Sequence, residues 1–574
     1  MVGITIGSSE IKIGQYADDT FLIIDGSKGS IRKALQILTH FEKISGLRIN
    51  VDKTQVIKLG TEYKDQICPI LNIPYSRTFK LLGIQFSSNL EEMEDINFTS
   101  KISNIRRIIR MYQWRNLTMA GRITIVKMQI LPNLIHLLSV LPSPRKQRMT
   151  ELNNILTQFI WDNRSPKIQL NTLVQDYKMG GQKMLHFSSF CKASKLSWVK
   201  RLYNTPETNS WIVIAKEIFK EKYIPFIFEG AVKCTQNMVR QLKNQFWKEV
   251  LNTWVFYREK IETLSEKNTI PHTVIWNSGL IGNNNLLIRR NMFMSKGLLY
   301  LKDLYNYNTQ EFKTRQQLHD LHNINISAFD HMCLIQSIPP RHKNIIINMI
   351  NCNSHFDNGN TNLVRKICSK QKLLRYTYLA MIRKLPFEIK AIPKWEYLFS
   401  TRIEQLKWQN IFTLPKQITI DSQTRIFQYK IIHRILPTNS LLHKYKLKTD
   451  PFCDLCHNII DTLEHTFHLC PRILQLWYDI ATWLFPEIDL FQYINSENII
   501  LGVYTEKLIL ENTLILSIKR YIYINKCKET QITLIGIKLF LRHIMILETS
   551  IKNENAKVKN VFKWATIVHK IQAA

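Results

Sequence analysis

The stretch IKIGQYADDTFLII (residues 11–24) places two adjacent carboxylates, Asp18 and Asp19, between two β-prone runs. This pattern predicts an antiparallel hairpin with the aspartates at its tip. Adjacent like charges lower stability unless water or a cation neutralises them. Carboxylate oxygens at such a tip suit a hard divalent cation such as Mg²⁺, which keeps open positions for phosphates. The alternative interpretation is a solvated turn that simply contains Asp-Asp.

The segments around this turn predict a small α/β unit followed by helices. Residues 4–6 form another β-prone run, and Ser30 can cap a helix that Ser45-Gly46 ends. Further β-prone runs lie at 56–57 and 81–86, and from about residue 97 the apolar pattern becomes helical. Pro132 should end or kink one of these helices. We expect an antiparallel sheet with a helix, then a mostly α-helical remainder.

The composition indicates a folded protein with a polyanionic partner. The chain has 574 residues, of which 45% are hydrophobic, so it can form several cores. Its 78 Lys and Arg residues outnumber 45 Asp and Glu, which gives a formal charge of +33. Phosphate contacts release condensed counterions without any sequence readout, so RNA and DNA are the expected partners. An ordinary basic soluble protein is the alternative.

The cysteines and the apolar segments of the sequence indicate the cellular location of the protein. Ten scattered cysteines are too sparse for a disulfide scaffold. The first residues lack the pattern of a signal peptide, and the most apolar later segment, 131–141, contains Pro132 and His136. We therefore expect no contact with a membrane and an intracellular protein, held in the cytoplasm or nucleus as a ribonucleoprotein. The oligomeric state stays open.

A cysteine cluster predicts a zinc site. The spacing Cys453-x2-Cys456-x8-His465-x4-Cys470 offers four ligands in two tight pairs, which suits a closed tetrahedral site with a structural role. His457 and His468 are rival ligands. His465 is preferred because its spacing to Cys470 matches the short zinc knuckles of retroelement proteins, although the central spacer here is longer. The alternative is a small core of free cysteines and histidines.

Three motifs in order carry a resemblance to a known family. They are Tyr16-Ala17-Asp18-Asp19, then 45–50 with Lys53-Thr54, then Phe79-Lys80-Leu81-Leu82-Gly83-Ile84. In this order and spacing they resemble the metal-binding turn, lysine-bearing loop and primer-grip hairpin of reverse transcriptases, those of non-LTR retrotransposons of the long interspersed element type above all. Later segments are similar to that family's thumb and to the region after it: Trp114-Arg115, Gly121-Arg122-Ile123, Lys127, Phe159-Ile160-Trp161 and Gly180-Gly181.

The resemblance implies roles for individual residues. Asp18 and Asp19 would be catalytic and bind Mg²⁺, with Asp18 the more direct ligand. Lys53 would lie near the phosphates of the incoming nucleotide. Around the nucleotide and primer end it implies three further residues: Tyr16, Leu82 and Gly83. On the thumb it implies a set of basic residues that contact nucleic acid, with a merely solvated face as the alternative for the arginines: Arg106, Arg110, Arg115, Arg122 and Lys127.

The resemblance also implies a domain order. Residues 1–95 would be a partial palm, 96–205 the thumb with the helical segment after it, and 206–360 a helical linker. Residues 361–574 would form a basic carboxy-terminal region with the zinc knuckle at 453–470 and terminal helices of unassigned role. By the same resemblance, the knuckle would help bind element RNA or target DNA.

The expected function follows the resemblance with one restriction. The parent activity would be target-primed reverse transcription by two-metal phosphoryl transfer. A palm of this family takes a further aspartate and the fingers from segments before its acidic turn, and an endonuclease from further upstream. We therefore expect a truncated enzyme that is inactive alone. The alternatives are a protein that binds nucleic acid through thumb and knuckle without catalysis, and a non-functional relic.

Overall fold

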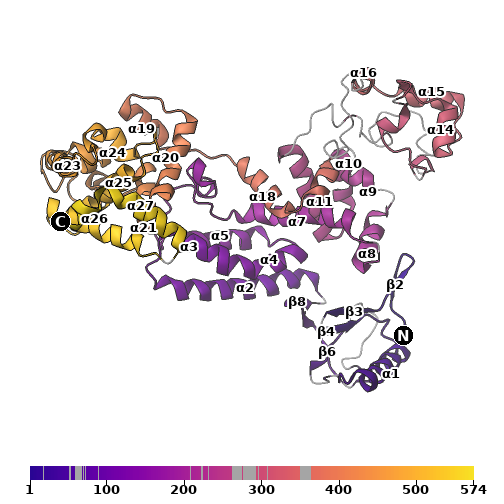
Figure 1. Cartoon of the computed structure of the whole chain (residues 1–574). Coiled ribbons are helices and arrows are strands. Elements are labelled where there is room, and N and C mark those ends of the chain that lie inside the picture. Colours follow the sequence, from indigo (N-terminus) through magenta and orange to yellow (C-terminus); the bar gives the residue numbers. More distant parts are fainter. Residues whose placement is uncertain are drawn as a thin grey trace. The chain divides into compact units, whose positions relative to one another are not determined.

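The computed structural model places most of the chain in helices (Figure 1). It describes all residues except 17–18, 49, 51–52, 59–67, 69, 72, 88, 207, 222–223, 230–231, 262–269, 271–274, 276–291, 295, 307, 349–362, 552 and 574. The chain forms two compact units. Unit 1 comprises Met1–Ile105, Pro132–Glu151 and Phe187–Lys384, and unit 2 comprises Arg106–Leu131, Leu152–His186 and Leu385–Ala574.

Unit 1 begins with short two-stranded sheets. Strands β1 (Ile4–Ile6) and β2 (Ser9–Ile11) form one antiparallel pair, and β3 (Ile13–Tyr16) and β4 (Asp19–Leu22) form the next. A parallel pair and an antiparallel hairpin follow, composed of β5 (Val56–Ile57), β6 (Tyr75–Ser76), β7 (Thr78–Leu81) and β8 (Ile84–Ser87). The described strands thus form separate ladders, and the small sheets accompany a mostly helical chain.

Helix α1 (Lys28–Ser45) follows the acidic hairpin and starts earlier than the sequence suggested. Its N-cap is Ser27, whose hydroxyl accepts the backbone N–H of Ser30 at 3.2 Å. The expectation that Ser30 caps this helix is therefore wrong, because Ser30 is buried and accepts the backbone N–H of Val2 at 3.0 Å. The expected stop is confirmed, since Gly46 takes the left-handed conformation at φ 73°.

The remaining helices of unit 1 form two cores. Helix α7 packs against α11, α17 and α18, around buried Trp254, Phe228 and Phe219. A smaller core surrounds β9, β10, α14 and α15 and contains buried Phe293 and Tyr305. The elements are α7 (Phe187–Asn204), α8 (Ser210–Phe219), α9 (Ile224–Phe228), α10 (Val232–Gln241), α11 (Gln245–Phe256), η5 (Tyr257–Ile261), η7 (Leu301–Leu304), β9 (Tyr305–Asn306), β10 (Glu311–Phe312), α14 (Arg315–His322), α15 (Ala328–Gln336), α16 (Pro340–Asn348), α17 (Leu363–Ser369) and α18 (Leu373–Arg383).

Of the next four helices, the first, third and fourth contain residues of both units, and the second belongs to unit 2 alone. They are α2 (Leu90–Gln113), α3 (Met119–Ile125), α4 (Leu131–Val140) and α5 (Lys146–Ile160). A π-turn, η2 (Val126–Ile130), joins α3 to α4 immediately before Pro132. The expectation that a helix ends at Pro132 is therefore wrong, because α4 continues through the proline directly after a π-turn, whose wider spacing suits the missing N–H donor.

By length and composition, Met119–Val140 is apolar enough to cross a membrane. Core helices of ordinary globular proteins pass the same test, and this stretch also contains Arg122, Lys127 and the π-turn. It is weak support for a membrane span.

Unit 2 has one large apolar core built from the carboxy-terminal helices. Trp395, Trp477 and Trp564 are almost completely buried in it. Two short helices, α6 (Leu170–Leu173) and η3 (Tyr177–Met179), precede these elements in the chain. The elements are α19 (Ile392–Phe399), α20 (Gln405–Ile418), α21 (Ser422–Ile432), α22 (Asn439–Lys444), η8 (His465–Leu469), α23 (Pro471–Leu484), η9 (Leu490–Tyr493), α24 (Ser496–Leu501), α25 (Ile509–Cys527), α26 (Leu534–Thr549), α27 (Glu554–Trp564), η10 (Ala565–Ile567) and α28 (Val568–Gln572).

Candidate metal centre and basic surface

The first two cysteines lie in a tight loop after α22. A bridge between Phe452 and Ile460 closes this loop, and the N–H of Cys453 donates to the carbonyl of Ile459 at 2.9 Å. His457 takes a left-handed conformation at φ 61°, and its N–H donates to the carbonyl of Cys453 at 2.8 Å. These bonds fold the loop back on itself and turn both thiols to one side.

The second pair of ligands comes from a π-turn and the start of the next helix. His465 begins η8, and Cys470 follows it as the N-cap residue of α23, with Pro471 in the first turn. Proline is favoured at that position because the N–H it lacks has no partner within a helix. The helix start is therefore fixed directly behind the fourth ligand.

The four side chains converge on one point. The ligand atoms of Cys453, Cys456, His465 and Cys470 all lie within 4.8 Å of one another. The sulfur of Cys456 is 3.3 Å from Nε2 of His465. Ligands of tetrahedral zinc lie roughly 3.8 Å apart, given Zn–S bonds of about 2.3 Å. Three sulfurs and one imidazole nitrogen at this spacing fit Zn²⁺. Because the protein supplies all four ligands, the site is closed and suits a structural role.

Hydrogen bonds favour a thiolate at Cys453, although the site is buried. Cys453, Cys470 and His465 are at most 2% exposed. A hydrogen bond from the Cys470 thiol lowers the pKa of Cys453, against the effect of burial, and backbone N–H groups add to the lowering. One of these is the N–H of Leu455, 3.4 Å from the Cys453 sulfur. The same sulfur–sulfur contact raises the pKa of Cys470. A bound cation would remove this competition and hold both groups as thiolates.

The two rival histidines are not members of this cluster. Nδ1 of His468 lies 2.8 Å from the hydroxyl of Ser496, and burial lowers the pKa of this histidine. His457 is exposed on the turn of the cysteine loop. The structure therefore groups His465 with the three cysteines, in the cluster that the predicted ligand set requires.

One buried carboxylate supports the loop from behind. Asp461 is fully buried and accepts the N–H of Asn439 at 2.7 Å and the hydroxyl of Thr466 at 2.6 Å. Its partner in a buried ion pair is Lys526 of α25. Nδ2 of Asn439 donates to the carbonyl of Phe452 at 2.6 Å, next to the first ligand. Asp461 thus joins α22, the zinc loop, η8 and α25.

Sequence reasoning missed this carboxylate. Its partner Lys526 is 65 positions later in the chain, so no local spacing relates the two. A buried Asp between Ile460 and Leu463 carries a weak signal, because aspartate is uncommon in an apolar stretch unless it is paired.

The residues expected around a polymerase centre lie in unit 1. Tyr16 pairs with Asp19 at the end of the β3–β4 hairpin, and both are exposed. Asp18 lies outside the described residues. Lys53 is also exposed, with its N–H bound to Asn50. Tyr16 and Asp19 thus lie on one short hairpin, and Lys53 lies outside it. The roles of all these residues stay predictions.

The expected primer-grip residues form a tight turn. Leu82 and Gly83 connect β7 to β8, with φ angles of 49° and 79°. Two consecutive left-handed residues are typical of a type I′ hairpin turn, although a leucine in the first position is strained. Nε2 of His136 contacts the carbonyl of Leu82 at 3.0 Å and helps to hold this conformation.

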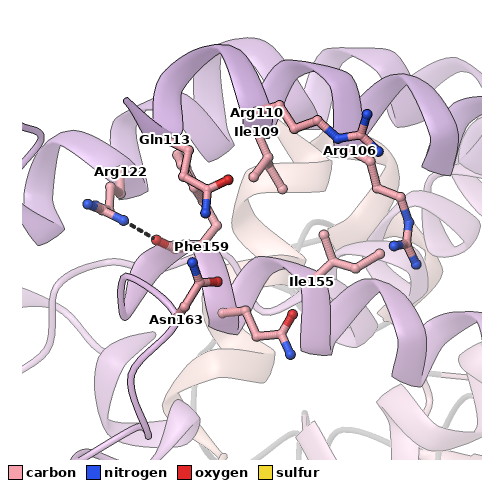
Figure 2. Close-up of a pocket in the computed structure, with 9 residues that line it drawn as sticks. Arg106, Ile109, Arg110, Gln113, Arg122, Ile155, Phe159 and Asn163 are labelled. Carbon is pink, nitrogen blue, oxygen red and sulfur yellow. Dashed lines mark hydrogen bonds between the residues drawn. The ribbon is translucent and has the colours of Figure 1, made fainter. Parts of the chain in front are cut away.

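Three of the predicted arginines line a pocket of about 170 Å³ in unit 2 (Figure 2). Arg106 and Arg110 extend from α2, and Arg122 lies at the other end of the pocket. Apolar side chains and amides complete the lining: Ile109, Ile155, Phe159, Gln113, Gln158 and Asn163. Within the described part of the chain, no carboxylate lines this pocket. A concave surface with several guanidinium and amide donors can bind a phosphate group.

The basic residues differ in how they are held. Arg122 is 6% exposed and donates to the carbonyls of Leu117 at 3.2 Å and Phe159 at 2.9 Å. It also pairs with Asp162 at 2.8 Å, so its main role is structural. Arg115 is exposed and lies over the ring of Tyr112 at 5.0 Å. Lys127 lies on η2, where burial and then repulsion from Lys183 lower its pKa.

A comparison with protein families agrees with this geometry. Residues 387–477 match a family model described as zinc-binding in reverse transcriptase. The matched segment contains all four ligands, together with Asn439 and Asp461 that support them. The chain therefore carries a reverse-transcriptase-associated zinc-binding region, which contains the cluster of Cys453, Cys456, His465 and Cys470.

Proposed function

We propose that this protein is related to the reverse transcriptases of non-LTR retrotransposons and binds nucleic acid through unit 2. The observation that carries the proposal is the closed Cys₃His cluster inside a segment matched by a reverse-transcriptase zinc-binding family. The zinc loop would be a structural support, since its ligands leave no open position for chemistry. The partner would be RNA of the element or DNA of the target.

The charge distribution supports this partner. The whole chain carries a formal charge of +33, and the pocket beside α2 presents Arg106 and Arg110. Phosphate contacts of this kind supply affinity without base recognition. We propose that Arg106, Arg110, Arg115 and Lys127 contact the backbone of the nucleic acid, while Arg122 positions the helices that carry them.

The parent activity would be RNA-directed DNA synthesis at a nick in target DNA. Asp18 and Asp19 would hold Mg²⁺, with Tyr16, Lys53, Leu82 and Gly83 around nucleotide and primer. Mg²⁺, when bound, would activate the primer 3′ hydroxyl and stabilise the leaving pyrophosphate. In this chain Tyr16 is 67% exposed and its hairpin has two strands. A two-stranded hairpin holds side chains loosely, so we propose that the chain alone does not synthesise DNA efficiently.

Two assays test this proposal on the full chain. Fluorescence anisotropy with labelled single-stranded RNA should show binding that weakens steeply with salt. Primer extension with Mg²⁺ and deoxynucleotides should show little product. Absence of RNA and DNA binding at low salt would contradict the binding function, and robust extension would contradict the restriction on catalysis.

A further inference from the structure

Several cations lie close together near Tyr177 in unit 2, and two of them, Lys183 and Lys416, lie over its ring. We name this group the Tyr177 cluster, and its cations come from three helical elements and one loop. Lys127 lies on η2, and Lys183 follows the turn after η3. Lys416 lies near the end of α20, and Arg425 lies on α21. The cluster therefore joins the segment that resembles a thumb to the region matched by the zinc-binding family.

The turn that carries Tyr177 is fixed by the backbone. The Asp176 side chain accepts the N–H of Lys178 at 3.2 Å and caps η3, which Gly180 ends at φ 71°. A Cβ on Gly181 would lie 2.1 Å from the carbonyl oxygen of Gln175, so glycine is required there. Nε2 of His433 contacts the carbonyl of Gly180 at 2.9 Å and ties the turn to α21.

The cations are held close to one another by aromatic and backbone contacts. Nζ of Lys183 lies 4.9 Å from the centre of the Tyr177 ring, and Lys416 also lies over this ring. Arg425 donates to the carbonyls of Thr419 at 2.6 Å and Lys416 at 3.5 Å. The side chains are thus gathered by the fold.

Positive charge exceeds negative charge in this cluster. Lys183 pairs with Asp176 at 2.7 Å. Asp421 is the carboxylate that attracts Arg425 electrostatically, but Asp421 is itself paired with Arg520. Burial lowers the pKa of Lys416 to about 8, and repulsion from Arg425, Lys183 and Lys127 contributes. Half-buried like charges raise the free energy of the folded state unless an anion neutralises them.

We propose that the Tyr177 cluster binds consecutive phosphate groups of a nucleic-acid strand. The spread of cations over three helical elements and a loop favours a chain of phosphates over a single anion, and lysine is suited to a backbone contact without base readout. The inference rests on the proposed nucleic-acid function and names residues of its interface. It assigns this role to Lys183, Lys416 and Arg425, and supports that of Lys127.

The test compares Lys127→Gln, Lys416→Gln and their double variant with Lys407→Gln. Lys407 is an exposed residue of the same helix α20. It is nine residues before Lys416 and so points to the opposite side of the helix. Lys407→Gln is the control, because it removes one positive charge from the same helix at a position outside the cluster. Lys416→Arg, which keeps the charge, should retain binding. Zinc content and circular dichroism of each variant check that the fold is intact.

The readout is the dependence of RNA affinity on salt, measured by anisotropy. Each Gln substitution in the cluster should weaken binding about threefold to tenfold at low salt and reduce the log–log slope by about 0.7. Lys407→Gln should behave as wild type. If the cluster variants match Lys407→Gln while wild type binds RNA, the inference is overturned and the proposed function stands. If wild type binds neither RNA nor DNA, both are overturned.

A competitor identifies the chemistry of the partner. Polyglutamate carries the same sign of charge without phosphates. It should displace RNA poorly, since carboxylates at peptide spacing do not match a phosphate backbone. If polyglutamate binds wild type as tightly as RNA and loses affinity equally in Lys416→Gln, the cluster recognises an acidic polypeptide and the assignment is overturned.

Discussion

The backbone N–H of Cys470 donates to the carbonyl of His465, five residues earlier, at 3.1 Å. In an ordinary α-helix, residues five apart lie about 140° apart around the axis. The wider π-turn of η8 brings the two residues back to the same side. The H-x4-C spacing thus becomes a chelating pair through one unusual turn.

Replacement of His465 by Ala should abolish stoichiometric zinc binding. The site would keep three thiolates, but a closed tetrahedral site needs its fourth ligand. Zinc content can be measured by atomic emission on the purified chain, and zinc release by a chromogenic chelator.

His468→Ala is the matched control, because this neighbouring histidine contacts Ser496 instead of the cluster. It should retain one zinc per chain. Full zinc content in His465→Ala, or loss of zinc in His468→Ala, would show that the ligand set is assigned incorrectly.

Replacement of Asp461 by Ala should destabilise the zinc loop by about 3–5 kcal/mol, because it leaves Lys526 buried without its partner. The N–H of Asn439 and hydroxyl of Thr466 also lose an acceptor. Hydrogen exchange of residues 439–470 should accelerate in the zinc-loaded protein. Asp454→Ala removes an exposed carboxylate of the same loop that accepts Nδ2 of Asn439 and pairs with Lys448. It should change exchange far less, because Nδ2 of Asn439 keeps its bond to the carbonyl of Phe452. Equal protection in both variants would contradict this account.

His433 should make unit 2 sensitive to acid. Burial lowers its pKa to about 4 in the folded state, from 6.5, although its contact with Gly180 opposes this. Between these values the unfolded chain binds a proton that the folded chain does not. Stability therefore falls as the pH decreases from about 6.5 to 4, by up to about 3 kcal/mol.

His433→Asn should lose most of this dependence while being less stable at pH 7. Urea unfolding of both proteins with excess zinc, at several pH values, isolates the contribution of the histidine. Parallel pH profiles for the two proteins would refute it.

Two arginines of the pocket in Figure 2 should respond oppositely to substitution. Arg122→Met removes both donors to buried carbonyls and leaves Asp162 without its partner. It should lower stability by about 1–3 kcal/mol for each unpaired carbonyl. Arg110→Gln, at an exposed position, should leave the melting temperature unchanged and weaken RNA binding. Thermal melts and anisotropy measure the two effects, and a reversed pattern would contradict the assignment.

The spacing of residues in the sequence was sufficient to predict features that depend on local contacts. The zinc ligands lie within eighteen residues, and the chain itself imposes their convergence. The prediction of Ser30 as the helix cap was wrong because the N–H of Val2, which is distant in sequence, donates to the Ser30 hydroxyl, and Ser27 caps the helix instead. Likewise, Pro132 suggested the end or a kink of a helix, but a π-turn that ends two residues earlier leads into a helix that continues through the proline.

Contacts between distant segments could not be predicted from the pattern. Asp461 and Lys526 form a buried pair, and Tyr177 meets Lys416 from a helix more than two hundred residues later. Neither pair shares a periodicity or a motif. Short β-prone runs were found in sequence, but their pairing into separate two-stranded ladders depends on the fold of the whole unit.

The crowding of cations around Tyr177 has a consequence for the unliganded protein. Mutual repulsion there is a form of local frustration, in which packing holds together groups that electrostatics drives apart. A bound phosphate chain would neutralise these charges and relieve that conflict. Binding of the nucleic acid would therefore also stabilise the folded state of this region. The nucleic acid would then act as a missing structural element of the protein that binds it.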